Sequence, residues 1–151
     1  MRWGKFLLLL MLFSARVPDA GAASPKIIKV LPHLLDREGR HSLSPSLYER
    51  DAYQALLRKN PALCSGLRFD VQWQAKRKAG TQLLLRVEIR GAKESRPVVL
   101  EQTVRREHSN RRWDSLRVDG DAYRKIGEVI AWRATLWDGD RLLAAENSFL
   151  W

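Results

Sequence analysis

The side chains best suited to bind a ligand are lysines and arginines gathered in two short segments. They are Lys76, Arg77 and Lys78 in the first segment, and Arg105, Arg106, Arg111 and Arg112 in the second. The planar guanidinium group of arginine matches the geometry of carboxylate and phosphate oxygens, so these segments could bind an anion. In a protein that is basic throughout, they could equally be ordinary solvated loops.

Two of the six tryptophans are of interest because of their positions in the sequence. Trp113 follows the second segment directly, and Trp137 precedes an Asp-Gly turn on the outward side of its predicted strand. If both are exposed, they would form a platform for a glycan or an aromatic ligand. The alternative is that they cover the end of the core. Trp73 and Trp132 have the inward spacing of core residues.

Other reactive chemistry is sparse in the sequence. His33, Asp36 and His41 lie within nine residues and could share a metal ion, but their spacing fits no helical or strand-based ligand pattern. The chain has no Gly-x-Ser-x-Gly motif and no glycine-rich phosphate loop. Its one cysteine, Cys64, excludes an internal disulfide and is predicted to be a small buried hydrophobe. The sequence therefore predicts no catalytic residue, no metal site and no cofactor.

Alternation of apolar and polar residues predicts that strands carry the basic segments. Residues 67–75 alternate throughout, and residues 83–89 place their odd-numbered apolar positions on one face. An edge strand is predicted at 26–31, ended by Pro32, and a loop at 33–43. Further strands are predicted at 97–104, 113–118, 128–137 and 141–151. Because antiparallel strands reverse direction at each turn, both basic segments and the 138–141 turn are expected at one end of the fold.

One helix is predicted at about residues 45–59. Ser46 and Glu49 have the spacing of a capping box, which marks the start of the helix. An apolar stripe with helical spacing is expected to pack on the sheet, and its members are Tyr48, Ala52, Ala55 and Leu56.

The last part of the chain predicts a β-hairpin around Asp138-Gly139. A two-residue turn would place Leu143 opposite Ala134 and Ala145 opposite Trp132. The inward face of the first strand is then expected to hold Ile130, Trp132, Ala134 and Leu136, with Arg133 and Thr135 pointing outward.

These elements predict a mainly β fold, an antiparallel sandwich of about seven strands with one inserted helix. The residues Trp132–Trp151 and the strand pair Leu67–Ile89, with a helix after the first strand, resemble immunoglobulin-like sandwich domains of exported bacterial proteins. The resemblance implies a fold and carries no activity.

The first 23 residues have the order of a secretory signal peptide. Arg2 and Lys5 precede the apolar run 6–13, and small residues follow at 20–23. The run is shorter than the roughly 20 residues that cross a bilayer, although an uncleaved anchor is the alternative. We expect one domain at 24–151 that is secreted or periplasmic in a bacterium, with no transmembrane segment after cleavage.

The charge of the chain indicates what kind of partner to expect. The whole chain carries +10, and residues 24–151 keep 24 basic and 16 acidic side chains. This surplus favours an anionic envelope polymer or an acidic protein, and export argues against nucleic acid. The function predicted is a non-catalytic binding or accessory module that uses the basic end. The alternatives are an assembly subunit that adds a strand at the edge Ile27–Leu31, and a hydrolase that uses loop carboxylates.

Overall fold

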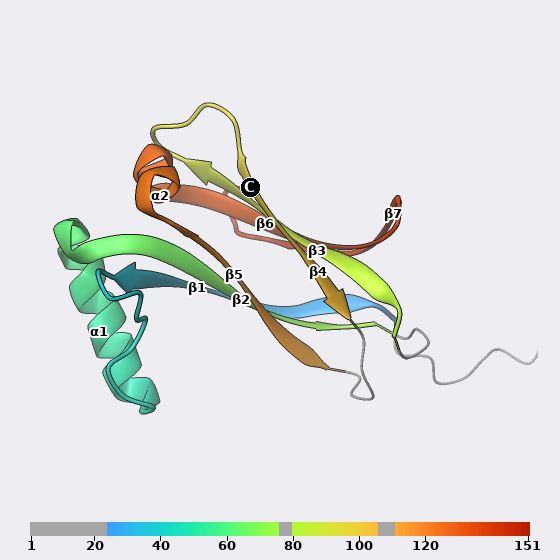
Figure 1. Cartoon of the computed structure of the whole chain (residues 1–151), viewed down its shortest axis with the longest axis horizontal. Helices are drawn as coiled ribbons and strands as arrows, with labels where there is room; N and C mark the ends of the chain where they lie inside the picture. The colour runs from blue at the N-terminus through green and yellow to red at the C-terminus, as the bar shows by residue number, and fades with distance from the viewer. Residues whose placement is uncertain (1–23, 76–79, 106–110) are drawn as a thin grey trace, which may run out of the picture.

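A computed structural model describes residues 24–75, 80–105 and 111–151 (Figure 1). These residues form two antiparallel sheets and three helical segments. The three-stranded sheet has the order β1-β2-β5, and the four-stranded sheet has the order β4-β3-β6-β7. In chain order the elements are β1 (Lys26–Asp36), α1 (Leu47–Lys59), the 3₁₀ helix η1 (Pro61–Leu63), β2 (Cys64–Gln74), β3 (Gln82–Gly91), β4 (Val98–Arg105), β5 (Arg112–Asp119), α2 (Gly120–Ile126), β6 (Val129–Asp138) and β7 (Arg141–Asn147). The predicted mainly β sandwich with an inserted helix is confirmed.

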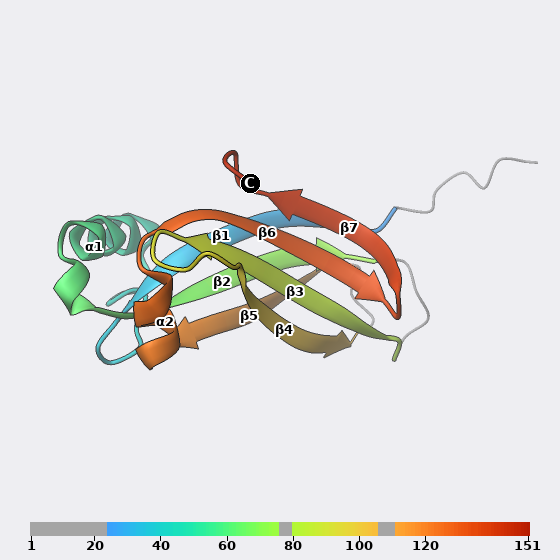
Figure 2. The same ribbon diagram turned by 90° about the horizontal axis from the view of Figure 1, so that it is seen from above.

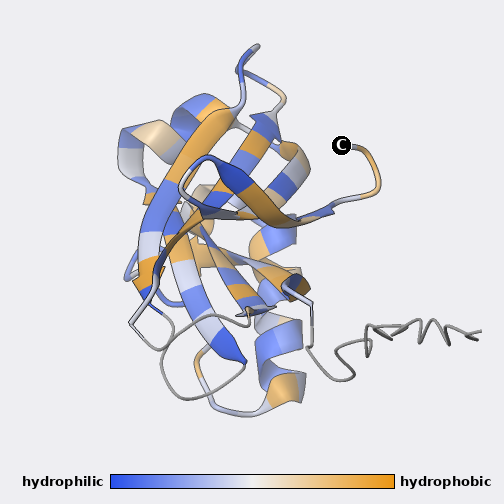
Figure 3. Ribbon diagram, turned by 90° about the vertical axis from the view of Figure 1, so that its right-hand side faces the viewer, coloured by the Kyte–Doolittle hydropathy of each residue, from blue (hydrophilic) through white to orange (hydrophobic). Residues whose placement is uncertain are grey.

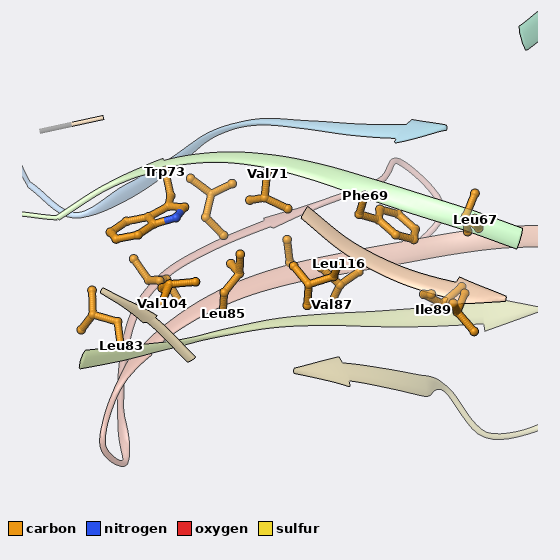
Figure 4. Close-up of a cluster of buried hydrophobic side chains, with 14 of the residues drawn as sticks. Leu67, Phe69, Val71, Trp73, Leu83, Leu85, Val87, Ile89, Val104 and Leu116 are labelled. Atoms are coloured by element: carbon orange, nitrogen blue, oxygen red, sulfur yellow. The ribbon is translucent and has the colours of Figure 1, made fainter. Parts of the chain in front are cut away.

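The core lies between the two sheets and follows the alternation in the sequence. Phe69, Val71 and Trp73 of β2 face Leu85 and other apolar residues of β3, and all of these side chains are buried (Figure 4). Bands of polar and apolar residues alternate along the strands (Figure 3). Each large apolar side chain that is fully buried contributes about 1.5–3 kcal/mol. The apolar layer between the sheets therefore supplies much of the free energy that stabilises the fold.

β1 is an edge strand, as predicted, but it is longer than predicted. It continues through Pro32 and ends at Asp36, so the residues expected to begin a loop pair with β2 instead. Proline is tolerated here because an edge strand needs ladder hydrogen bonds on only one side.

α1 begins one residue after Ser46, whose hydroxyl accepts a hydrogen bond from the amide of Glu49 as predicted. The predicted apolar stripe is wrong, however, because Tyr48 is 84% exposed and Leu56 is 46% exposed. The helix instead buries Gln54 and Leu57.

Hydrogen bonds made by Gln54 explain why α1 turns this face, rather than the predicted apolar stripe, toward the sheet. Its amide bonds the backbone N–H and C=O of Leu34 at 2.8 and 2.9 Å, and the C=O of His41 at 2.8 Å. Because buried backbone groups must be hydrogen-bonded, three such bonds outweigh the burial of a short apolar stripe.

The β6–β7 hairpin forms, but its predicted register is wrong. Gly139 has φ +56° and lies in the turn, which is closed by the pair Asp138–Arg141. The turn residues are Gly139 and Asp140 rather than Asp138 and Gly139, which shifts the pairing by two residues. A bulge between Leu136 and Trp137 shifts it by one more, so Ala134 pairs with Glu146 rather than with Leu143. The bulge lets both Leu143 and Ala144 pack against the core.

The inward face of β6 differs from the prediction at Ile130. Ile130 is half exposed because a bulge separates its neighbours in the pairing with β3. Thr135 keeps the predicted outward parity, which it shares with Trp137, but it is only 1% exposed, and its hydroxyl accepts a hydrogen bond from the indole of Trp137 at 2.9 Å.

The two ends of the sandwich differ. The β6–β7 turn and the strand ends that flank residues 76–79 and 106–110 lie at one end, whereas the helices lie at the other (Figures 1 and 2). α2 approaches β3 closely at Gly91, where any Cβ atom would overlap the carbonyl oxygen of Ile126. Within the described residues, we find no helix with the length and apolar character to cross a membrane.

Candidate functional site

The strand ends that carry the two basic segments lie together, as the sequence predicts. Gln82 at the start of β3 pairs with Arg105 at the end of β4, and Trp73 near the end of β2 pairs with Arg112. Arg105 and Arg111 are exposed, and Arg112 is half-buried. The predicted binding residues Lys76, Arg77, Lys78 and Arg106 lie outside the described residues.

The two candidate tryptophans do not share one surface. Trp113 projects from the outer face of the three-stranded sheet and is 47% exposed. Trp137 lies on the outer face of the four-stranded sheet, where the guanidinium of Arg86 is 5.5 Å from its ring centroid. The proposed double platform is therefore wrong, and only Trp113 remains as an exposed stacking surface. Trp73 is fully buried and Trp132 packs against the core, as predicted.

Trp113 borders a shallow cleft of about 260 Å³ on the outer face of β1, β2 and β5, which we call the outer-face cleft. Three strands, a loop and α1 contribute to it. Its described lining residues are Leu31, His33, His41, Arg50, Arg68, Asp70, Trp113 and Ser115. A polar floor beside an exposed indole ring is suited to a ligand that is both hydroxylated and partly apolar.

Asp70 lies at the centre of the cleft because its strand, β2, is the middle strand of its sheet. One carboxylate oxygen accepts hydrogen bonds from Arg68 Nε at 2.7 Å and from the Ser115 hydroxyl at 2.5 Å. The other oxygen is 3.5 Å from His33 Nε2. Because Ser115 donates to the carboxylate and not to the imidazole, these residues do not have the order of a nucleophile–base–acid relay.

The two histidines of the cleft lie against each other, with ring centroids 5.1 Å apart. Burial lowers the pKa of His33 and outweighs the opposing charge of Asp70, and burial also lowers the pKa of His41. The contact between His33 and Asp70 is therefore mainly a polar contact at neutral pH, rather than a full ion pair. Of the described lining residues, Arg50 and Arg68 are then the cations and Asp70 is the one anion.

The histidine–aspartate metal hypothesis is not supported by the geometry of Asp36. Its carboxylate accepts hydrogen bonds from the Tyr53 hydroxyl at 2.6 Å, from Arg40 Nε at 2.9 Å, and from the backbone N–H groups of Glu38 and Arg40. It is thus already engaged in holding the β1–α1 loop. The described part of the chain contains no group of three or more side chains placed to hold a metal ion.

Sequence reasoning did not find the outer-face cleft. His33, Asp70 and Ser115 come from three strands and are far apart in the chain, so no local spacing connects them. One sign of the cleft is present in the sequence: the alternation along residues 67–75 places the charged residues Arg68 and Asp70 on the outward face of β2.

The resemblance to immunoglobulin-like domains stays a prediction about the finer class of the sandwich. Comparison of the chain with protein-family models, with curated proteins and with solved structures gives no match.

Proposed function

We propose that the protein is an exported, non-catalytic binding module that holds an acidic glycan of the bacterial envelope in the outer-face cleft beside Trp113. The observation that carries the proposal is the half-exposed ring of Trp113 beside a cleft with two arginines and one carboxylate among its described residues. The leader-like residues 1–23 support export.

The chemistry of the cleft fits a sugar ring. An indole face packs against the apolar face of a pyranose, while its hydroxyl groups exchange hydrogen bonds with side chains such as Asp70, Ser115 and His41. Arg50 and Arg68 favour a sugar that carries a carboxylate or another anionic group. Arg111 and Arg112 directly precede Trp113, so a longer acidic chain would continue along cationic surface.

The test is retention of the protein on an immobilised uronic-acid polymer and on a neutral dextran across a salt gradient. We expect retention on the acidic polymer that falls as salt rises, because screening weakens exposed charge pairs. Trp113→Ala should weaken binding by roughly tenfold, since an aromatic contact is worth about 0.5–1.5 kcal/mol beyond its area.

The matched control uses the outer face of the other sheet. Arg86 pairs with Glu101 there at 2.7 Å, just as Arg68 pairs with Asp70. Arg68→Gln should weaken retention, whereas Arg86→Gln should not, although both remove one charge. Equal loss in both variants would show that net charge alone binds the polymer and would refute the cleft.

The strand-addition alternative is less well supported by the geometry of β1. Lys26, Lys29 and Pro32 lie along this edge, and the pairing shifts between Ile27 and Lys29. Charges, prolines and bulges are features that blunt an edge against further pairing. Binding of an envelope protein that is insensitive to salt would favour this alternative.

A further inference from the structure

A second and larger depression lies at the end of the sandwich that carries the helices. It is a groove of about 1140 Å³ between α1 and η1 on one side, and α2 with the start of β6 on the other. We call it the helix-end groove. Pockets that bind small molecules commonly enclose about 300–1,000 Å³, so this groove has room for an extended ligand.

The groove exists because the helices leave the end of the sandwich open. α1 packs on β1 and is held there by the Gln54 hydrogen bonds, whereas α2 packs against β2, β3 and β5. Both helices appear at the same end in Figure 2. The space between them is lined by side chains from both sheets.

Apolar side chains form much of the groove. The accessible ones include Leu34, Val129, Ile130 and Trp132, and the buried Leu57 and Leu67 lie behind them. Ile130 is 50% exposed there, although it belongs to a central strand of its sheet. An apolar ligand that enters the groove removes this surface from water, which lowers the free energy of the system.

The rim of the groove is cationic. Its described charged residues are Arg37, Arg58, Lys93 and Arg124, against one carboxylate, Glu128. Arg37 donates a hydrogen bond to the backbone oxygen of Ala62, and Arg124 pairs with Asp121. Within the described part of the chain, Arg58 and Lys93 make no ion pair, which leaves two cations on the rim available to an anionic group.

Two further polar residues of the groove lining are uncharged. Cys64 and Tyr123 also line the groove, and the Cys64 thiol donates a hydrogen bond to the backbone oxygen of Leu57 at 3.5 Å. Burial raises the pKa of the Cys64 thiol and of the Tyr123 phenol, so both groups are neutral at physiological pH.

We propose that the helix-end groove binds a single-chain anionic lipid of the fatty-acid type. The acyl chain lies on the apolar lining that includes Leu34, Ile130 and Trp132, and the carboxylate meets Arg58 and Lys93. The charge of the rim argues for the anionic head, and the apolar lining argues for the chain. The inference does not rest on the glycan proposal, because the groove and the outer-face cleft share no described lining residue.

The experiment measures displacement of a fluorescent fatty acid, dansylaminoundecanoic acid, from the full chain. Competitors are dodecanoate, shorter fatty acids, dodecanol and dodecyl phosphate. We expect saturable binding, and roughly fourfold weaker competition for each methylene removed, which corresponds to about 0.8 kcal/mol per buried methylene. Dodecanol should compete worse than dodecanoate. Dodecyl phosphate that competes better than dodecanoate would overturn the carboxylate assignment.

Two charge-matched variants locate the site. Arg58→Gln with Lys93→Gln removes the two rim cations, and we expect about fivefold weaker binding for each charge removed. Lys59→Gln with Arg96→Gln removes the neighbouring exposed cations of α1 and of the β3–β4 loop, which do not line the groove. This control should bind as the wild type does.

A third variant obstructs the groove without touching a buried residue. Ala62 is exposed and lines the groove, so Ala62→Trp should reduce binding while leaving the unfolding transition unchanged. Absence of saturable binding, equal loss in the two charge variants, or equal competition by dodecanol and dodecanoate would each overturn the proposal. Loss of glycan retention would leave these results unaffected.

Discussion

Asp36 offers the sharpest test of how the loop between β1 and α1 is held. Burial raises the pKa of this carboxyl, but hydrogen bonds from Tyr53 and Arg40 and the charge of Arg40 outweigh burial and lower its pKa from 3.8 to about 2. The side chain is 5% exposed. The difference in pKa corresponds to about 2 kcal/mol of stability at neutral pH.

The sign of the effect follows from proton binding. Because the pKa of Asp36 is lower in the folded state, the unfolded state binds the proton more readily. The stabilisation is therefore fully present above about pH 4, and it is lost as the pH falls through 2. Asp36→Asn should lower the free energy of unfolding by about 2 kcal/mol at pH 7, and this difference from the wild type should shrink below pH 4.

Urea unfolding of both proteins at a series of pH values measures this difference. Asp51→Asn is the control, since Asp51 pairs with Arg50 on the exposed surface of α1. An exposed pair contributes little, so we expect a loss below about 1 kcal/mol. A difference between wild type and Asp36→Asn that stays constant from pH 7 to pH 2 would refute the assignment of the low pKa to Asp36.

Two further predictions concern α1 and the outer-face cleft. Leu57→Ala should lower the free energy of unfolding by about 2–5 kcal/mol because Leu57 is fully buried, whereas Leu56→Ala, at a half-exposed position, should cost much less. Equal losses in urea unfolding would contradict the observed rotation of the helix. For His33 the pKa is lowered in the folded state, so stability should decline as the pH falls below 6.5. His33→Gln should flatten this decline between pH 7 and about pH 5, and an unchanged slope would show that burial of His33 does not cause it.

The strand pattern of the core was predictable because its cause is local. In β2 and β3 the side chains alternate between the two faces of a strand, so the positions of Phe69, Val71 and Val87 in the core follow from the order of residues. The cap at Ser46 was predictable for the same reason, since the hydroxyl and the amide that it accepts from are three residues apart. The meeting of the strand ends around both basic segments followed from the reversal of antiparallel strands.

Features that depend on distant segments were not predictable in the same way. The choice between the two faces of α1 was made by the two hydrogen bonds that join the side chain of Gln54 to the backbone N–H and C=O of Leu34, which lies 20 residues earlier. The bulge in the β6–β7 hairpin was set by the fit of Leu143 and Ala144 to the core, and no turn residue encodes it.

The sequence by itself determined a basic chain with an alternating β core and a capped helix, because composition, period and capping act over a few residues. Tertiary structure alone decided that His33, Asp70 and Ser115 meet on one sheet face, and that the helices leave a groove with a cationic rim open at one end of the sandwich. Both sites are assembled from segments far apart in the chain. Their geometry depends on strand register and helix rotation, which are settled only when the whole core packs.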